Sequence, residues 1–440
     1  MKNDKIKILA LGDYCCSTGF ATVMSNIMSE LNATGRYDID VIGINFDGNP
    51  DYDTSRFPGR VWPAVSALQM AGPYGDPYGR QRFLDRLGMG IYDVVFILQD
   101  TFIVQELIGP MLETYNQIDK KFKVVYYFPF DATPKKEWVD KVVCNVDYPV
   151  AYTEYAKNEA LKFMPELAQK LDVIYHGTNI ADFYPIEKQE EIDHFRETYF
   201  AGKTKGRFLL TNVNRNQSRK DIVRNFMILA ELRKRGYDSP MLYLHMQHDD
   251  QGGNILVMAD HFGFKIGEDY ILPNQQGFSA QWGFPVEVLN FIYNSSDAIL
   301  STTLGEGWGL SITEAMATKR PMIAPDHTSI TEMMADGRGH LVKAGANPSM
   351  WMQKELDNER LRPLMDVEDA ADKICALVDG KAPDTTKKAY DWVQNLTWQK
   401  ICERWISKID TAAAEAKAAT ATGSMAKNRA DRRRIAREGK

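Results

Sequence analysis

The sequence predicts an α/β protein made of two similar halves, each with a parallel β-sheet covered by helices. In the first half, short buried-strand patterns alternate with amphipathic helix patterns, which is typical of parallel sheets. The same alternation restarts after a polar boundary at residues 202–206. The chain then changes character, because residues 389–409 carry apolar side chains at helical spacing.

The first half begins with a continuous apolar run at residues 6–11, which predicts a buried strand. A helix is predicted next, because apolar residues recur at helical spacing from Phe20 to Leu31, and Gly35 is placed to end it. Residues 45–90 are rich in Gly, Pro, Asp and Tyr, and we expect a long loop or insertion over the strand ends. Further short strands are predicted at residues 39–44, 94–98 and 124–128.

The second half repeats this order with a strand at residues 208–213 and an amphipathic helix at 221–235. Four more short strands are expected at residues 241–246, 270–272, 298–301 and 321–325. Three tryptophans lie in the helical segment 389–409, which suggests that it packs on something large, across both halves. Residues 411–422 are of low complexity, and residues 427–440, with seven Lys or Arg against two Asp or Glu, predict a mobile helix or a disordered tail.

The composition is that of an ordinary globular protein. The 440 residues are 44% hydrophobic and 25% charged, with a net charge of −6, which excludes a disordered chain, a collagen-like chain and a strongly basic nucleic-acid coat. The five cysteines form no Cys-x-x-Cys pair, so neither a disulfide framework nor a zinc ribbon is expected. The first apolar run is too short for a secretory signal and no run could span a membrane, so we expect a cytoplasmic protein.

The strongest functional signal is the string Gly-Glu-Gly-Trp-Gly-Leu-Ser, which follows a predicted strand and opens a predicted helix. The backbone N–H groups of Gly309, Leu310 and Ser311 are placed to bind an anion at the helix N-terminus. Glu306 and Glu314 flank them, and carboxylates accept paired hydrogen bonds from vicinal diols. The pattern therefore suits a sugar nucleotide, whose phosphates lie between two diols; a glycine-rich turn before a capped helix is the alternative.

Three weaker signals also lie at predicted strand ends. Arg215 and Lys220 could reach a diphosphate, although a solvated basic loop explains them as well. Gly19 lies in a glycine-containing strand–helix turn that lacks the dinucleotide pattern G-x-G-x-x-G. Asp131 follows a strand, where side chains of an open α/β sheet face the ligand crevice.

Together these motifs resemble those of retaining glycosyltransferases of the GT-B type, similar to glycosyltransferase family 4 (glycosyl transferases group 1). The resemblance rests on Glu306…Glu314 and its glycine-rich core, on Arg215…Lys220, on Val-Ile-Tyr-His-Gly-Thr-Asn with the following Phe-Tyr-Pro, and on Thr-Gly-Phe-Ala around Gly19. It covers residues 5–410, nearly the whole chain.

The resemblance implies two facing Rossmann-like domains and a C-terminal crossover helix. The implied divisions are an acceptor-side domain at 1–197, a donor-binding domain at 198–388, a crossover helix at 389–410 and a tail at 411–440.

It also implies site roles. Arg215 and Lys220 would neutralise the diphosphate, Glu306 would hold donor-sugar hydroxyls and Glu314 the ribose. Gly19 and the amides of residues 309–311 would contact phosphate and sugar. His176 is a candidate for the donor-binding cleft, with a hydrogen-bonded structural histidine as an equal alternative. Two departures stand out: Asp131 occupies the neighbourhood in which many relatives have a histidine, and Lys220 is followed by Asp221 instead of glycine.

The expected function is transfer of a hexose, with retention of configuration, from a nucleotide-sugar donor, a UDP-sugar being favoured, to an unidentified acceptor. The acceptor could be a glycan, a lipid-linked molecule or a modified nucleic acid. No cofactor or metal is expected; residues 245–250 could suggest a metal cluster, but they lack a matching second cluster and a surface loop explains them better. Alternatives are an enzyme that hydrolyses or epimerises the sugar nucleotide, a catalytically weak sugar-nucleotide-binding protein, and a transferase acting on modified DNA bases. The basic tail could contact an anionic surface, such as a membrane.

Overall fold

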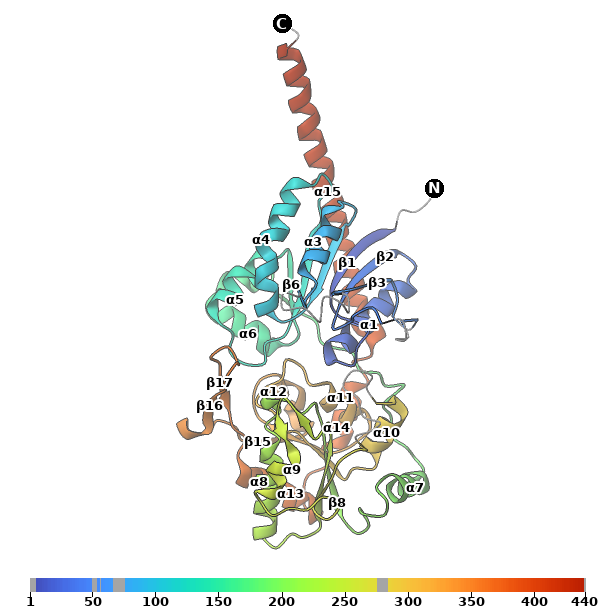
Figure 1. Ribbon diagram of the computed structural model, residues 1–440, viewed down its shortest axis with the longest axis vertical. Helices are drawn as coiled ribbons and strands as arrows, with labels where there is room; N and C mark the ends of the chain where they lie inside the picture. The colour runs from blue at the N-terminus through green and yellow to red at the C-terminus, as the bar shows by residue number, and fades with distance from the viewer. Residues whose placement is uncertain (1–4, 50–53, 56, 66–75, 275–283, 439–440) are drawn as a thin grey trace.

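The computed structural model describes residues 5–438 except 50–53, 56, 66–75 and 275–283, with side chains described up to residue 423. It has two α/β domains, one above the other in Figure 1. The N-terminal sheet has the strand order β3-β2-β1-β4-β5-β6-β7, and every pair in it is parallel. Its strands are β1 (Ile6–Asp13), β2 (Tyr37–Ile44), β3 (Arg60–Pro63), β4 (Val94–Leu98), β5 (Lys123–Phe128), β6 (Tyr148–Ala151) and β7 (Asp172–Val173).

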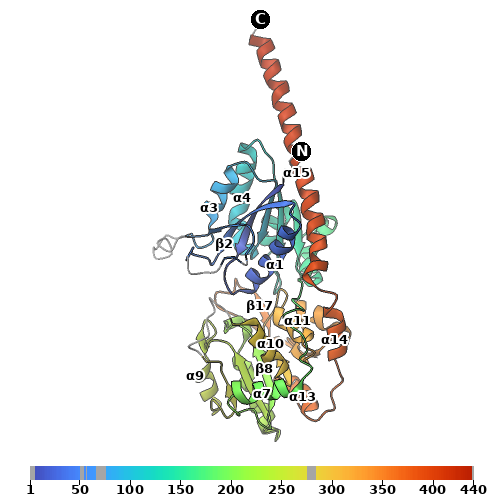
Figure 2. The same ribbon diagram turned by 90° about the vertical axis from the view of Figure 1, so that its right-hand side faces the viewer.

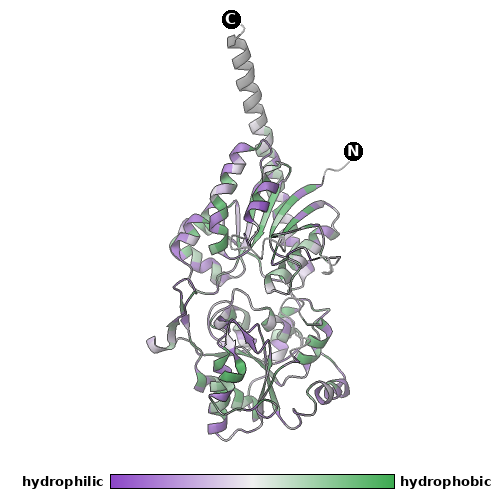
Figure 3. Cartoon of the chain, in the orientation of Figure 1, coloured by the Kyte–Doolittle hydropathy of each residue, from purple (hydrophilic) through white to green (hydrophobic). Residues whose placement is uncertain are grey.

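The central strand β4 is apolar and buried on both faces, and green dominates the strands of this domain in Figure 3. Parallel strands of this kind need cover on both sides, and amphipathic helices supply it. The helices of this domain are α1 (Gly19–Ala33), α3 (Arg80–Gly88), α4 (Thr101–Gln117), α5 (Lys136–Lys141) and α6 (Glu154–Phe163).

The C-terminal sheet has the order β12-β9-β8-β13-β14-β15 and is also parallel throughout. Its strands are β8 (Phe208–Val213), β9 (Pro240–His245), β12 (Tyr270–Ile271), β13 (Ala298–Leu300), β14 (Met322–Pro325) and β15 (His340–Val342). Its helices are α7 (Gln189–Tyr199), α8 (Val223–Lys234), α9 (Ile255–Asp260), α10 (Val286–Asn294), α11 (Leu310–Ala317), α12 (Ser329–Met334) and α13 (Val367–Val378). Two small hairpins extend it, β10 (Asp249–Asp250) with β11 (Gly253–Asn254) and β16 (Trp351–Gln353) with β17 (Leu361–Pro363).

Both sheets reverse their strand order beside their first strand, between β1 and β4 in one domain and between β8 and β13 in the other. Open α/β sheets bind ligands at the carboxyl ends of the strands at such switch points. The expected fold class, two Rossmann-like domains with parallel sheets, is therefore confirmed.

The chain returns to the N-terminal domain at its end. After α14 (Thr386–Val393), α15 (Trp398–Glu438) runs along the N-terminal domain and projects beyond it (Figures 1 and 2). Trp405 is fully buried there, with its ring centroid 5.3 Å from that of Phe96 and 4.6 Å from that of Tyr127. Close to the start of α15, Thr178 forms a parallel bridge with Thr397, so the two connections between the domains lie side by side.

Two expectations about elements need correction. The long loop predicted for residues 45–90 contains the strand β3 and the helix α3. Arg60–Pro63 pairs with β2 at the sheet edge, and α3 buries its apolar face at Phe83 and Leu87. Residues 50–53, 56 and 66–75 of this segment lie outside the described part. The helical segment at 389–409 is two helices separated at residues 394–397. The low-complexity residues 411–422 continue α15, with Ala412, Ala413 and Ala416 buried against the domain.

Candidate functional site

A cluster of four charged side chains lies where the two domains meet. Lys220 Nζ is 2.5 Å from Glu306 Oε1, and Arg219 Nη1 is 3.2 Å from Glu306 Oε2. Arg219 also reaches across the interface, with its Nε 3.2 Å from Asp131 Oδ2. The cluster therefore joins the end of β8, the end of β13 and the end of β5, all at the carboxyl edges of their sheets.

The two loops that carry these C-terminal residues are tied to each other by backbone-directed hydrogen bonds. The hydroxyl of Thr302 donates to the carbonyl of Lys220 (2.9 Å), and the amide of Leu304 donates to the carbonyl of Arg219 (2.8 Å). The buried hydroxyl of Ser329 contacts the carbonyls of Glu306 (2.9 Å) and Trp308 (2.8 Å). Glu306 and Lys220 are thus held at fixed positions.

Thr328 supports this loop in an unusual backbone conformation. Its φ is 56° and its ψ is −144°, a region that β-branched residues rarely adopt. The amide of Glu306 donates to Thr328 Oγ1 over 3.2 Å, and the same hydroxyl donates to the His327 carbonyl over 2.7 Å. Backbone strain of this kind persists only where the surroundings over-determine it, and it concentrates at functional sites.

The N-termini of α1 and α11, one from each domain, face each other beside the cluster. A Cβ built on Gly19 would lie 3.6 Å from Leu310 Cδ1, so the two helix starts nearly touch. The start of α1 is fixed because Thr18 Oγ1 accepts from the amide of Ala21 (3.1 Å) and donates to buried Asp13 (2.7 Å). Helix N-termini favour anions, so the two helix starts, with Lys220 and Arg219 on the Glu306 that precedes α11, form a candidate anion site.

Glu314 lies in the second turn of α11, on the side of Tyr293. Its Oε2 accepts a hydrogen bond of 2.6 Å from the Tyr293 hydroxyl, and burial raises the pKa of Glu314 to about 7. Its other oxygen has no partner among the described residues. It can therefore accept a hydrogen bond from a ligand hydroxyl.

Neighbouring cations lower the pKa values of both carboxylates in the charged cluster. Burial by itself would raise the pKa of Glu306, but the charges of Lys220 and Arg219 outweigh it and lower this pKa to about 2. Burial also opposes ionisation of Asp131, yet Arg362, Arg360 and Arg219 together lower its pKa below the ordinary value. Both are anions at neutral pH, and both already have cationic partners.

A hairpin of the C-terminal domain holds Asp131 of the N-terminal domain. From β17 and the turn before it, Arg360 Nη1 lies 2.6 Å and Arg362 Nη2 lies 3.2 Å from Asp131 Oδ1. Arg362 is fully buried, and Asp357 binds its Nε over 2.7 Å. The backbones also meet closely, because a Cβ on Gly305 would lie only 2.0 Å from the Asp131 carbonyl oxygen. Only glycine fits at that position.

The structure separates two of the predicted site residues from this cluster. Arg215 forms a two-point ion pair with Asp250, at 2.7 and 3.2 Å, and its side chain is 45% exposed. His176 is 2% exposed, accepts or donates a 2.6 Å hydrogen bond with the Tyr127 hydroxyl, and packs against the ring of Trp308. Burial lowers the pKa of His176 to about 3, so it is a neutral packing residue, and we do not retain it in the donor site.

Sequence reasoning missed Arg219, Arg360 and Arg362. Arg219 directly precedes Lys220, a predicted phosphate ligand, and this position in the sequence could have identified it as a site residue. Arg360 and Arg362 lie 229 and 231 positions from Asp131, and no local pattern connects them.

The segment 245–250 does not form a metal cluster. Among the residues that the structure describes, no three His, Cys, Asp or Glu side chains are grouped to hold a metal ion. His245 instead exchanges a 2.9 Å hydrogen bond with the Tyr243 hydroxyl, and Asp250 pairs with Arg215. Nor is any helix within the described ranges both long enough and apolar enough to cross a bilayer.

This geometry defines a GT-B architecture, with two Rossmann-like domains whose strand ends face a shared site. Comparisons with known proteins agree. The family model described as glycosyl transferases group 1 matches residues 277–379, which include Glu306 and Glu314. The motifs and the family model thus agree on a similarity to glycosyl transferases group 1 over these residues.

Curated relatives match over part of the chain. Trehalose synthases of Thermococcus litoralis and Pyrococcus furiosus are each 30% identical over 173 residues, which is 38% of this chain and 35% of theirs. The match thus spans about a third of the length of those relatives.

Solved structures match over almost the whole chain. Anabaena Alr3699/HepE, in complex with UDP-glucose, has 14% identity and a TM-score of 0.66, covering 92% of this chain and 100% of that one. Sucrose-phosphate synthase from Thermosynechococcus elongatus has 16% identity and a TM-score of 0.68, covering 93% and 100%. At these identities the similarity establishes the fold.

Proposed function

We propose that this protein is a retaining glycosyltransferase that moves a hexose from a nucleotide-sugar donor, a UDP-sugar being favoured, to a hydroxyl acceptor. The observation that carries the proposal is the pairing of Lys220 and Arg219 with Glu306, four residues before the start of α11, together with the contact between the starts of α1 and α11, at the switch points of both sheets. A diphosphate is the ligand that this arrangement of positive charge and free amides fits best. The UDP-glucose bound by Anabaena Alr3699/HepE, which shares the fold, supports the choice of donor.

In the proposed complex, Gly19 and the amides of Leu310 and Ser311 contact the diphosphate. Lys220 and Arg219 stabilise the negative charge that grows on it as the bond to the sugar breaks. Glu306, freed in part from Lys220 by the phosphate, accepts hydrogen bonds from the sugar hydroxyls. Glu314 accepts a hydrogen bond from the ribose.

The chemical step needs no protein nucleophile in this proposal. The bond between the sugar C1 and the diphosphate oxygen breaks, and the acceptor oxygen bonds to C1 on the same face. The acceptor's proton passes to the departing diphosphate, which keeps the bonding electron pair. Catalysis then consists of positioning the reactants and stabilising the leaving group, and we propose that it requires no metal.

The test has two stages. Thermal-shift measurements with UDP, GDP, ADP, CMP and dTDP on the full chain should show stabilisation by one of them, with the shift lost in Lys220→Ala. Turnover of the matching nucleotide sugar, followed by proton NMR of the product anomer, then checks retention of configuration. A well-folded protein that binds none of the nucleotides contradicts the proposal, and binding without turnover on any acceptor indicates a sugar-nucleotide-binding protein instead.

A further inference from the structure

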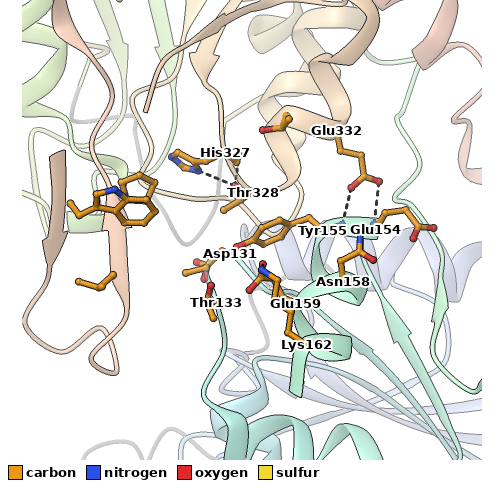
Figure 4. A pocket seen from close by; sticks show the side chains of 15 residues that line it. Asp131, Thr133, Glu154, Tyr155, Asn158, Glu159, Lys162, His327, Thr328 and Glu332 are labelled. Carbon is orange, nitrogen blue, oxygen red and sulfur yellow. Dashed lines mark hydrogen bonds and ion pairs between the residues drawn. The ribbon is translucent and has the colours of Figure 1, made fainter. Parts of the chain in front are cut away.

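A cavity of about 600 Å³ lies between the domains, next to the charged cluster but not lined by Lys220 or Glu306 (Figure 4). Its walls come from three places: α6 of the N-terminal domain, the segment from His327 to Glu332, and the β16–β17 hairpin. Asp131 and Thr328 also line it. Because the amide of Glu306 binds Thr328, the cavity adjoins the place proposed for the donor sugar.

One wall is a fixed aromatic surface. Trp351 lines the cavity and is 44% exposed, although its indole Nε1 donates a 2.9 Å hydrogen bond to the carbonyl of Gly345. The ring also lies against Gly345, where an added Cβ would be 2.7 Å from its Cε2. A flat apolar ring that is held rigid and left exposed inside a cavity suits the C–H face of a sugar ring.

Another wall offers an unpartnered polar atom. Glu159 is 5% exposed, and its Oε2 has no hydrogen-bond partner among the described residues. His327 also lines the cavity; its Nδ1 contacts the Thr328 hydroxyl over 3.2 Å, and its ring interacts with the backbone of Thr303. Buried polar atoms without partners are rare in native proteins, and a bound ligand is one way to satisfy them.

The charged side chains that line the cavity indicate which class of acceptor it can bind. Four carboxylates line the cavity, those of Asp131, Glu154, Glu159 and Glu332, against the single ammonium of Lys162. Lys162 is already paired with Glu159, and burial lowers the pKa of His327 to about 4, so it is neutral at pH 7. The arginines that approach Asp131 are bound to it and to Asp357. Among the described residues that line the cavity, no cation is therefore free to bind a phosphate, whereas carboxylates readily accept hydrogen bonds from hydroxyls.

We propose that this cavity is the acceptor site and that it takes an unphosphorylated sugar or polyol. The sugar's C–H face packs on Trp351, its hydroxyls donate to Glu159, and His327 lies beside it. The proposal rests on the transferase function proposed above. It goes further by naming the acceptor class and by assigning recognition to a hairpin of the donor-binding domain.

The test uses the full chain with UDP present and glucose or glucose 6-phosphate as the probe, with binding followed by saturation-transfer NMR titration. We expect glucose to bind at millimolar concentration and glucose 6-phosphate at least tenfold more weakly. Trp351→Ala and Glu159→Gln should each weaken glucose binding at least fivefold while leaving the UDP-induced thermal shift unchanged. Leu356→Ala is the matched control, because Leu356 lies in the same hairpin, is 97% exposed and does not line the cavity.

Three results overturn this assignment: no glucose signal up to 100 mM, equal binding of the phosphate ester, or unchanged glucose binding in both cavity variants. None of them affects the thermal shift with UDP. Failure of the acceptor site is therefore distinguishable from failure of the proposed function, which would remove that shift in the unaltered protein.

Discussion

Lys220 and Glu306 lie 86 positions apart in the chain, yet their side chains form a 2.5 Å ion pair at the edge of the C-terminal sheet. The pair exists because β8 and β13 are neighbours at the strand-order reversal, so the loops after them meet. A bound diphosphate would compete with Glu306 for Lys220. The pair thus keeps the ammonium in place for an anionic ligand.

Replacing Lys220 by alanine should weaken UDP binding by about 10- to 100-fold, since a charge-assisted hydrogen bond contributes about 1.5–3 kcal/mol. Isothermal titration calorimetry measures the change. Arg215→Ala is the comparison, with an expected loss of less than about threefold, because Arg215 is exposed and paired with Asp250. An equal loss in the two variants would show that Arg215 exchanges Asp250 for the phosphate, as the motif predicts.

Uridine binding should depend on the ionisation of Glu314. If the ribose donates to this carboxylate, affinity rises from pH 5.5 to pH 8 and levels off above the pKa of about 7. Below that value, the ionised fraction falls about tenfold per pH unit. Uridine is chosen over UDP because it carries no titrating phosphate. NMR titrations at several pH values provide the measurement, and Glu314→Gln should flatten the profile; a sloping profile in that variant assigns the effect to another group.

Asp131→Ala should destabilise the protein strongly, by about 3–5 kcal/mol, because it leaves buried Arg362 without one of its carboxylate partners. Thermal unfolding monitored by circular dichroism gives the change in melting temperature. Asp250→Ala removes the carboxylate of a more exposed pair and should cost less than about 1 kcal/mol. Similar melting temperatures for the two variants would mean that the hairpin does not hold the domains together.

Glycines 177 and 109 should respond differently to alanine. A Cβ on Gly177 would lie 2.4 Å from the Trp398 ring, so Gly177→Ala should destabilise by about 1–3 kcal/mol through overpacking. Gly109 lies inside α4 with open space around its would-be Cβ, but it precedes Pro110, whose ring offsets the gain in helix propensity, so Gly109→Ala should change stability by less than about 1 kcal/mol. Thermal unfolding of both variants tests the pair, and a stable Gly177→Ala protein would show that Trp398 can shift.

Lys220 and Glu306 could be placed near one another from sequence, because each follows a buried strand and the parallel strands of one sheet end at a common edge. Asp131 and Gly19 follow strands of the other sheet, and the resemblance to two-domain glycosyltransferases, which implies a cleft between the domains, set Gly19 beside the phosphates. The partners of Asp131 could not be found this way. Arg360 and Arg362 reach it through a hairpin beyond the last strand of the other domain, and only tertiary packing sets that approach.

His176 shows a second limit. A histidine between a strand and a helix looks the same in sequence whether it faces a ligand or an aromatic cluster. The three-dimensional packing of Tyr127 and Trp308 around it decides the matter. The arginines after β8 show the same limit. The motif spacing predicts Arg215 as the phosphate ligand, whereas in the structure the turn at residues 218–220 directs Arg219 toward Glu306.

The paired connections between the domains, joined where the amide of Thr178 donates to the carbonyl of Leu396 over 2.6 Å, act as a single pivot. A rotation about this pivot that opens the interface would move the β16–β17 hairpin, at another margin of the interface (Figure 1), away from Asp131 and α6. Such an opening would break the Asp131 ion pairs and remove the hairpin from the cavity at the same time. With donor and acceptor bound as proposed, the donor would be able to bind the open form, whereas the acceptor cavity would be complete only in the closed form.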